Sequence, residues 1–457
     1  MASSSVDRVR EVVGALFGPP AERSFAVHYW NGTEDPPGIP SDSPFSLHVR
    51  REGALRRMLL PPSELSIAEA FIAGDVDLGG NSESAMHLGD VIGSRIQSLS
   101  GLRRMMPLLL ALPRDGDDAR DSLEDVQFKP ATKGPARPRG GADAIQHHYD
   151  VGNDFYRLWL DERMVYTCAF FSSDDELLED AQLAKLDLIC RKLRLEPGQR
   201  LLDIGCGWGA LIMHAAANYG VDATGITLSA AQAELGRERI AAAGLVDRCR
   251  IELRDYRDLN AVDEYDRIAS VGMMEHVGND RLPGYFDAAY RALKPGGVFV
   301  NHTIVGDGRR THESPLDRLK ARLWKRDHFT HKYVFPDGLL VTLARVVDCA
   351  EAAGFEVRDV ESLREHYTQT LRHWLGRLEA NAAEASSMVG DRRYRTWRLY
   401  MLGAINGFRS GKTGIVQIIL TRSDSRGTSG VPWRRNYMLE SPDRFTPSSR
   451  QPNGEQP

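Results

Sequence analysis

Long apolar runs are missing from this chain of 457 residues. A helix that spans a membrane needs about 20 consecutive apolar residues, and no stretch of the sequence approaches that length. The N-terminal stretch MASSSVDRVREVVGALFG has early acidic residues and lacks the long apolar core of a signal peptide or a membrane anchor. We therefore expect a cytoplasmic protein.

Neither a cysteine pattern nor a strong charge bias is present. The five cysteines are an odd and scattered set without Cys-x-x-Cys spacing, which argues against a disulfide framework and a zinc site, and we expect no metal. The formal net charge is -5, so the total charge does not favour nucleic acid as a partner. Any attraction to a membrane must come from a local patch.

Composition divides the chain into four segments. Residues 113–141 are rich in proline, glycine and charge with almost no large apolar residue, which predicts a flexible linker. Residues 1–112 before it suggest a small α+β domain. Residues 142–437 alternate strand and helix patterns, which is typical of a mostly parallel sheet. Residues 438–457 are predicted to be a disordered tail.

The regular alternation after the linker has the spacing of doubly wound units. Each of the first two predicted strands is followed by a helix pattern. The predicted strands are 200–204, 221–227, 250–255, 265–271 and 295–305, and the predicted helices between them include 210–220 and 229–244.

The stretch DIGCGWG, residues 203–209, follows the first predicted strand and opens the first predicted helix. Its glycines permit a tight turn and let a ligand approach backbone N–H groups at a helix start. Taken alone, such a loop fits either a dinucleotide or S-adenosylmethionine. A dinucleotide fold favours GxGxxG and an acidic residue at the end of the second strand, whereas this loop has GxGxG and that strand ends at Thr227.

Asp255 closes the third strand, at a place suited to accept a hydrogen bond from an adenine amine. The order of glycine loop, polar second strand end, aspartate on the third strand and PGG before the fifth strand resembles the class I methyltransferases. An ordinary strand-to-helix turn accounts for one glycine but not for three with these downstream partners. We therefore predict an α/β fold with a Rossmann-like doubly wound sheet that binds S-adenosylmethionine, preceded by the small α+β domain.

Several longer motifs are more specific. With them, residues 143 to 421 resemble the cyclopropane-fatty-acyl-phospholipid synthases, which are relatives of the mycolic acid methyltransferases. The N-terminal domain and the linker resemble the extra domain of the phospholipid-acting members, which the mycolate-modifying branch lacks. In order along the chain, the motifs are HYDVGNDFYRLWLD, MVYTCAFF, GCGWG, GITLSAAQ, MMEHVG, HTI, KYVFPDG and REHYTQTLRHW.

The resemblance implies an enzyme that transfers a methylene group from S-adenosylmethionine to the double bond of an unsaturated acyl chain in a phospholipid, forming a cyclopropane. It also implies a bound bicarbonate ion that deprotonates a carbocation, and peripheral association with the inner face of the membrane; it leaves a homodimer open. Glu275 would accept a hydrogen bond from the O–H of bicarbonate and would not take the proton itself. The implied bicarbonate contacts are Cys168, Glu275, His302, the backbone of Ile304, and Tyr367.

The same resemblance implies the contacts of S-adenosylmethionine. Thr167 departs from the common Tyr-Ser pair of the family but keeps the hydroxyl. The rings of Tyr149, Phe170, Phe171 and Tyr367 are expected to face the cationic intermediate, since an aromatic face attracts positive charge. The implied contacts are Tyr166, Thr167, Asp203, Gly205, Gly207, Thr227, Gln232, Asp255 and Tyr256.

Less specific interpretations stay open for some of these features. Cys168 is also explained as a buried core cysteine, Glu275 as a charge at the start of a helix, and His276 is interpreted as structural. Residues 315–338 fit either an amphipathic helix packed on the core or an interfacial helix that docks on anionic phospholipid. Residues 101–113 are more typical of core.

Other products and functions also stay open. Loss of a different proton from the same cation gives a methylene-branched chain in place of a cyclopropane. A small-molecule or sterol methyltransferase would share the glycine loop and EHVG but would not need Cys168, His302 and Tyr367 together. A lipid-binding or carrier protein would be suggested by the N-terminal domain alone.

Overall fold

The computed structural model describes residues 4–61, 63–97, 99–114, 123–127, 152–307, 329–335 and 340–439. It divides the chain into two compact units, each discontinuous in sequence. Unit 1 comprises Met1–Leu160, Asp307–Gly338 and Tyr367–Thr413, and unit 2 comprises Asp161–Gly306, Leu339–His366 and Gly414–Pro457. The domain boundaries predicted from composition do not coincide with these compact units, and they stay a prediction for the functional domains.

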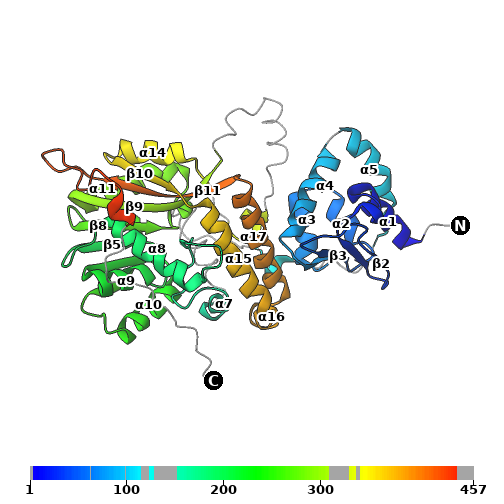
Figure 1. Ribbon diagram of the computed structural model, residues 1–457, viewed down its shortest axis with the longest axis horizontal. Coiled ribbons are helices and arrows are strands. Elements are labelled where there is room, and N and C mark those ends of the chain that lie inside the picture. The colour runs from blue at the N-terminus through cyan, green and yellow to red at the C-terminus, as the bar shows by residue number, and fades with distance from the viewer. Residues whose placement is uncertain are drawn as a thin grey trace, which may run out of the picture. The chain divides into compact units, whose positions relative to one another are not determined.

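In its described part, unit 2 is built on a seven-stranded sheet of order β10-β11-β9-β8-β5-β6-β7 (Figure 1). The strands from β9 to β7 pair in parallel, and β10 pairs antiparallel with β11. A backbone hydrogen bond joins Gly296, near the start of β9, to Arg422, just after β11. Gly414, near the start of β11, lies next to Val305, near the end of β9. β11 therefore runs antiparallel to β9. The strands are β5 (Arg200–Ile204), β6 (Asp222–Thr227), β7 (Cys249–Leu253), β8 (Tyr265–Val271), β9 (Leu293–Gly306), β10 (Glu356–Ser362) and β11 (Thr413–Thr421).

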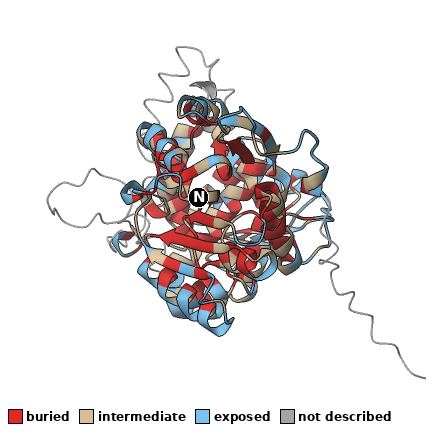
Figure 2. Cartoon of the chain, turned by 90° about the vertical axis from the view of Figure 1, so that its left-hand side faces the viewer, coloured by how far each residue is buried: buried red, intermediate tan, exposed pale blue. Residues whose placement is uncertain are grey.

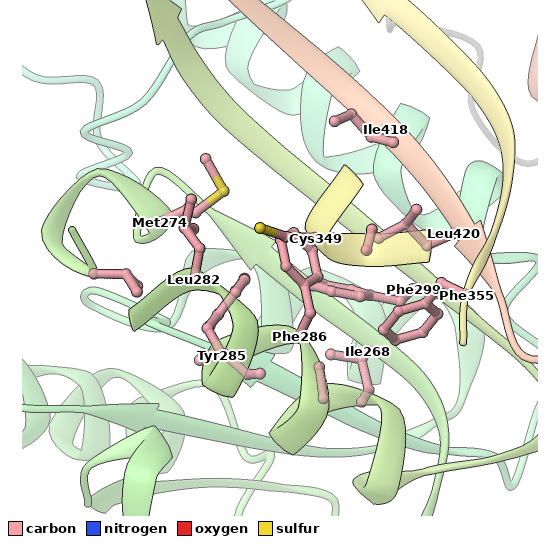
Figure 3. Packing of buried hydrophobic residues seen from close by; sticks show 14 of the residues in the cluster. Ile268, Met274, Leu282, Tyr285, Phe286, Phe299, Cys349, Phe355, Ile418 and Leu420 are labelled. Atoms are coloured by element: carbon pink, nitrogen blue, oxygen red, sulfur yellow. The ribbon is translucent and has the colours of Figure 1, made fainter. Parts of the chain in front are cut away.

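Helices cover both faces of this sheet. Successive side chains of a strand point to opposite faces, so Leu202 and Ile268 join one hydrophobic cluster (Figure 3) while Leu201 and Ala269 join another. Most strand residues are therefore buried, as Figure 2 shows in red. The first cluster includes residues of α11 (Leu282–Ala292) and α14 (Leu343–Ala352), and the second includes residues of α8 (Leu178–Leu193), α9 (Ala210–Tyr219) and α10 (Ala230–Ala242).

The predicted Rossmann-like sheet is confirmed. All five predicted strands and both predicted helices are present, with ends that differ by at most two residues. Sequence analysis missed β10 and β11, which complete the sheet beyond β9. The parallel strands place their carboxyl ends at one edge, where open α/β sheets bind ligands.

Unit 1 contains a four-stranded sheet of order β2-β1-β3-β4, in which β1 and β3 are parallel and the other pairs antiparallel. The predicted α+β character of the N-terminal segment is confirmed. Met105, Leu109 and Leu112 are buried in its core, so residues 101–113 contribute to the core as predicted. The elements are α1 (Ser5–Phe17), β1 (Ala26–Tyr29), β2 (Glu34–Asp35), β3 (Phe45–Val49), α2 (Ala54–Leu59), α3 (Glu64–Ile72), β4 (Val76–Gly80), α4 (His87–Gln97) and α5 (Leu99–Ala111).

Later segments of the chain complete unit 1. Asp77 of β4 accepts hydrogen bonds from Arg395 and Arg398, each at 3.0 Å. The indole rings of Trp159 and Trp374 lie 5.6 Å apart between centroids, in an edge-to-face arrangement. These contacts hold together segments that are distant in sequence. The later helices of unit 1 include α7 (Asn153–Arg157), α15 (Arg364–Ala380), α16 (Ala382–Val389) and α17 (Asp391–Arg409).

Among the described residues, no helix is long and apolar enough to cross a bilayer. The predicted linker lies largely outside the described residues. Of residues 315–338, the structure describes only 329–335, which include α13 (Phe329–Tyr333). Phe329 and Tyr333 are buried within unit 1. The predicted tail begins inside α18 (Asn436–Leu439), and its remainder lies outside the described residues.

Candidate active site

The glycine loop joins β5 to α9 through backbone conformations that favour glycine. Gly205, Gly207 and Gly209 have φ values of 86°, 56° and 86°, in the region that costs other residues energy. A side chain at Gly205 would collide with Met273, whereas one at Gly207 would meet nothing within 4 Å. Gly207 therefore borders open space at the start of a helix, where backbone N–H groups are available to a ligand.

Asp203 lies beneath this loop, near the end of β5. The residue is 2% exposed, and its Oδ1 has no hydrogen-bond partner among the described residues. Burial raises the pKa of Asp203 to about 7, and the positive charge of Lys185 opposes that rise. An enclosed acceptor without a partner beside an open glycine loop is what a donor group of a bound cofactor would satisfy.

The ends of β6 and β7 carry the next predicted cofactor residues. The Thr227 hydroxyl donates to Oε1 of Gln232 at 3.0 Å, so the structure brings these two together. The Asp255 carboxylate accepts from the backbone N and Nε of Arg257, each at 2.9 Å. Arg257 was missed from the sequence, and a carboxylate retains acceptor capacity beyond these bonds. Tyr256 is half-buried beside them.

Helix α8 anchors the segment that carries Tyr166, Thr167 and Cys168. Nε2 of Gln182 donates to the Thr167 carbonyl at 2.8 Å, and Nζ of Lys185 donates to the Thr167 hydroxyl at 2.9 Å. A side chain on Gly272 would lie 2.8 Å from Cγ2 of Thr167. The segment therefore packs against the carboxyl end of β8, at the same sheet edge as the glycine loop.

The Lys185 ammonium is enclosed in this region. Burial lowers the pKa of Lys185 to about 8, while the nearby carboxylates of Asp161 and Asp203 oppose that change. Sequence analysis missed Lys185 and Gln182. The available signal was AQLAKLDL, in which two polar residues three apart share the apolar face of a helix.

The thiol of Cys168 is fully buried. Its Sγ lies 3.2 Å from the carbonyl oxygen of Ala169 and 3.7 Å from that of Leu363. The thiol proton therefore has backbone acceptors nearby, which fits the core interpretation of Cys168 as well as the site interpretation. Its contact with bicarbonate stays a prediction.

Glu275 lies in a helical turn, Met274–His276, directly after β8. The backbone N–H of Ile304 donates to its Oε1 at 2.6 Å. Its Oε2 is enclosed and has no hydrogen-bond partner among the described residues. Burial raises the pKa of Glu275 to about 7, and the hydrogen bond from Ile304 opposes that rise. The Ile304 amide therefore serves Glu275, and its predicted contact with bicarbonate stays a prediction.

His302 lies on β9, beside the end of β8. Val271 is its register partner, and Gly272 donates its N–H to the His302 carbonyl at 2.9 Å. The imidazole is fully buried, and burial lowers the pKa of His302 well below its usual value. Its Nδ1 lies 3.0 Å from Nε2 of Gln417, while its Nε2 has no partner among the described residues.

The aromatic residues predicted to face the cationic intermediate lie in different surroundings from one another. Tyr367 belongs to unit 1, where its ring contacts Phe408 at a centroid distance of 4.7 Å, so its approach to Glu275 stays a prediction. Phe170 stacks on the ring of His366 at 4.8 Å. Phe171 is buried, and its backbone N–H donates to His366 at 3.0 Å. Tyr149 lies outside the described residues.

Together, these contacts form one edge of unit 2 with two kinds of chemistry. The glycine loop, Asp203 and the pair Thr227–Gln232 offer donors and acceptors around open space. Glu275 and His302 add an acceptor and a ring nitrogen, both enclosed and both without partners among the described residues. Such orphaned buried polar atoms indicate a site for a small polar ligand.

Comparison with known proteins shows which family the chain resembles. A family model described as mycolic acid cyclopropane synthetase matches residues 137–418. A Pseudomonas putida protein named "Probable fatty acid methyltransferase" is 36% identical over 427 residues, which are 92% of this chain and 98% of that protein. Cyclopropane mycolic acid synthase 1 of Mycobacterium tuberculosis is 38% identical over 276 residues, which are 60% of this chain and 94% of that protein.

A solved structure extends the likeness to three dimensions. The crystal structure of mycolic acid cyclopropane synthase CmaA1, complexed with SAH and CTAB, matches with a TM-score of 0.57 and 36% identity. The match covers 62% of this chain and 99% of that chain.

Proposed function

Because the chain belongs to the mycolic acid cyclopropane synthetase family and is an S-adenosylmethionine-dependent methyltransferase, we propose that it forms a cyclopropane on an unsaturated acyl chain of a phospholipid. The methylene group comes from S-adenosylmethionine. The enzyme would act at the inner face of the membrane, on which it would be a peripheral protein.

The extent of the likeness supports a fatty acyl substrate. The relative named as a fatty acid methyltransferase matches 92% of this chain, whereas cyclopropane mycolic acid synthase 1 matches only 60%. The fatty acid relative thus has a counterpart of the N-terminal α+β segment, which lies outside the match to the mycolic acid synthase. We assign that segment to the presentation of a phospholipid.

The reaction requires one bond change at sulfur and one proton loss. The alkene attacks the sulfonium methyl carbon, a C–C bond forms, the C–S bond breaks and S-adenosylhomocysteine leaves. The second alkene carbon then carries the positive charge. Loss of one proton from the new methyl group closes the three-membered ring, and water must be excluded until that happens.

One observation carries the proposal: Glu275, in the turn after β8, and His302, on the neighbouring strand β9, each have one enclosed polar atom without a partner among the described residues. Bicarbonate has one O–H donor and further acceptor oxygens, so it fits an acceptor at Glu275 and a donor at His302. When bound, it would supply a proton acceptor small enough to share an apolar site with an acyl chain.

S-adenosylmethionine fits the other half of the edge. Gly207 leaves space that a side chain would fill, and Asp203 has an enclosed acceptor for a donor of the cofactor. Thr167, Thr227 and Gln232 would add polar contacts at the ends of the same strands.

Product analysis tests the proposed function. Purified protein is incubated with vesicles of a cis-monounsaturated phospholipid and S-adenosylmethionine labelled with ¹³C in the methyl group. The lipid should gain the label as one CH2 group, with ring protons at high field in the proton NMR spectrum. Saturated phospholipid vesicles are the matched control and should stay unlabelled.

The same spectrum separates the alternatives. Olefinic protons of a terminal methylene, in place of ring protons, would assign the methylene-branched product. Absence of label from every vesicle, together with transfer to a sterol or a small soluble acceptor, would contradict the phospholipid proposal.

A further inference from the structure

A chain of polar side chains leads to His302 from three other elements of unit 2. Lys192 of α8 forms an ion pair with Glu361 of β10. Its Nζ also donates to Oε1 of Gln417 on β11 at 2.7 Å, and Nε2 of Gln417 lies 3.0 Å from Nδ1 of His302. Lys192, Gln417 and His302 are at most 2% exposed, so water does not compete for these bonds.

Lys192 sets the direction of each hydrogen bond in this chain. An ammonium group only donates, so the amide atom that faces Lys192 is the acceptor Oε1, and the NH2 group of Gln417 faces the imidazole. His302 therefore accepts at Nδ1. Burial, helped by the charges of Lys185 and Lys192, lowers the pKa of His302 well below its usual value. The ring is therefore neutral, and its single proton is on Nε2.

We propose that Lys192 and Gln417 are positioning residues that fix His302 as the Nε2–H tautomer, which makes it a hydrogen-bond donor to the group bound beside Glu275. The inference rests on the proposed function, because that function places an anion there. In the other tautomer, Nε2 would present a lone pair to an anionic oxygen, and the hydrogen bond would be lost.

The cost of the arrangement supports a role beyond packing. Burying the Lys192 ammonium takes it out of water, and an apolar group of similar size is often at least as stabilising at such a place. The ion pair with Glu361 compensates the charge of Lys192, but it does not explain why the buried residue between Lys192 and His302 is a glutamine. Among Glu361, Lys192 and Gln417, the amide of Gln417 is the group that contacts His302. Its orientation decides whether the imidazole accepts or donates at Nδ1.

Two substitutions change the direction of the bonds while keeping the size of the side chains. In Gln417→Glu, both carboxylate oxygens are acceptors, so Lys192 and a proton on Nδ1 are both satisfied, and His302 should switch to the Nδ1–H tautomer. In Lys192→Met, the amide is free to turn over, and a mixture of tautomers is expected. Thr421→Val, a buried polar change at the far end of β11, is the matched control.

The tautomer is measured directly on the full-length protein labelled with ¹⁵N in histidine. Two-bond ¹H–¹⁵N correlations distinguish the two neutral tautomers from imidazolium, and the His302 signals are those that vanish in His302→Gln. We expect Nε2–H in the wild type and in Thr421→Val, Nδ1–H in Gln417→Glu, and a mixture in Lys192→Met. An Nδ1–H or charged ring in the wild type, or an unchanged ring in both variants, overturns the proposal.

Kinetics on phospholipid vesicles test the consequence. Gln417→Glu should lower kcat by roughly 10-fold or more, on the scale of losing a hydrogen bond to a charged group, with KM for S-adenosylmethionine and the melting temperature close to wild type. A tautomer switch without loss of kcat would overturn the positioning role. Wild-type protein with the expected tautomer but no activity on phospholipid would contradict the proposed function and leave the assigned tautomer standing.

Discussion

At the scale of single residues, burial decides what Glu275 can do. Its pKa of about 7 makes both protonation states accessible near neutral pH, and its Oε2 is an acceptor without a partner among the described residues. The Ile304 amide holds the other oxygen at 2.6 Å. The carboxylate is thus fixed in place on one side and available on the other.

Replacing Glu275 should therefore separate catalysis from cofactor binding. Glu275→Gln keeps the size of the side chain and should lower turnover by roughly 100-fold, the scale of losing a positioned acid–base element. Calorimetric titration with S-adenosylhomocysteine should give an affinity close to wild type, because most of the predicted cofactor contacts lie at the ends of β5, β6 and β7. A collapse of affinity together with rate would make Glu275 a cofactor ligand.

Glu275 should also make stability depend on pH. Its folded pKa, about 7, lies above its ordinary value of 4.5, so folding favours the protonated form. The associated stabilisation is fully present below pH 4.5 and is lost as the pH rises through 7. Glu275→Gln stays neutral, so we expect the variant to gain stability over wild type by up to about 3 kcal/mol between those values. Denaturant unfolding at pH 5 and pH 8 measures the difference, and an equal difference at both values would exclude a raised pKa.

At the scale of elements, α8 is the helix that supports both halves of the candidate site. Gln182 and Lys185 hold the segment with Thr167, and Lys192, two turns later, reaches Gln417. Residues 3, 4 and 7 apart lie on one face of a helix, so the three polar residues share one side of α8. The helix is therefore a support for the site as well as a core element.

Lys185 should matter for the cofactor. Lys185→Met keeps much of the apolar stem but removes the donor to Thr167 and the charge near Asp203, and we expect binding of S-adenosylhomocysteine to weaken by roughly 10-fold, the scale of one hydrogen bond to a charged group. Lys412→Met, at an exposed lysine in unit 1, is the control and should bind as wild type does. Unchanged affinity in Lys185→Met would show that α8 does not support the cofactor site.

The elements that could be predicted from the sequence are those with a periodic or local pattern. The five parallel strands were predicted from the alternation of strand and helix patterns, and the glycine loop from its spacing. β10 escaped because, at the sheet edge, most of its residues are partly or fully exposed. Gln417 escaped because its partners, His302 and Lys192, are 115 and 225 residues away in sequence, and only the folded sheet reveals that it is the amide between them.

At the scale of the whole molecule, unit 1 joins the N-terminal segment to helices from the second half of the chain. Asp77 connects β4 to Arg395 and Arg398 of α17, and Glu83 binds Arg372 of α15 with two hydrogen bonds of 2.8 and 2.7 Å. Composition placed a boundary near residue 112, but it could not show that this segment packs with α15 and α17.

Asp77 should therefore stabilise unit 1 without affecting the cofactor. Asp77→Ala removes the carboxylate shared by the buried Arg398 and the half-buried Arg395, which costs up to about 3 kcal/mol, and should lower the melting temperature. Turnover on vesicles should fall if unit 1 presents the lipid, while affinity for S-adenosylhomocysteine should hold. Asp90→Ala, at an exposed carboxylate, is the control. Full turnover in a destabilised Asp77→Ala would show that the contacts of Asp77 are not needed for lipid presentation.

We propose that Glu275 and His302 hold a small oxyanion from solution, and that this oxyanion takes the proton of the methylated chain. The most direct test of this proposal is the rate of methylene transfer in carbonate-free buffer, measured after assay of carbonate retained by the purified protein, and again with added bicarbonate. We predict that the wild-type rate falls on removal and returns on addition, and that Glu275→Gln needs more bicarbonate, because its charged acceptor for the O–H of the ion is lost. An undiminished rate in protein shown to be free of carbonate would rule out bicarbonate as the base and make Glu275 itself the base.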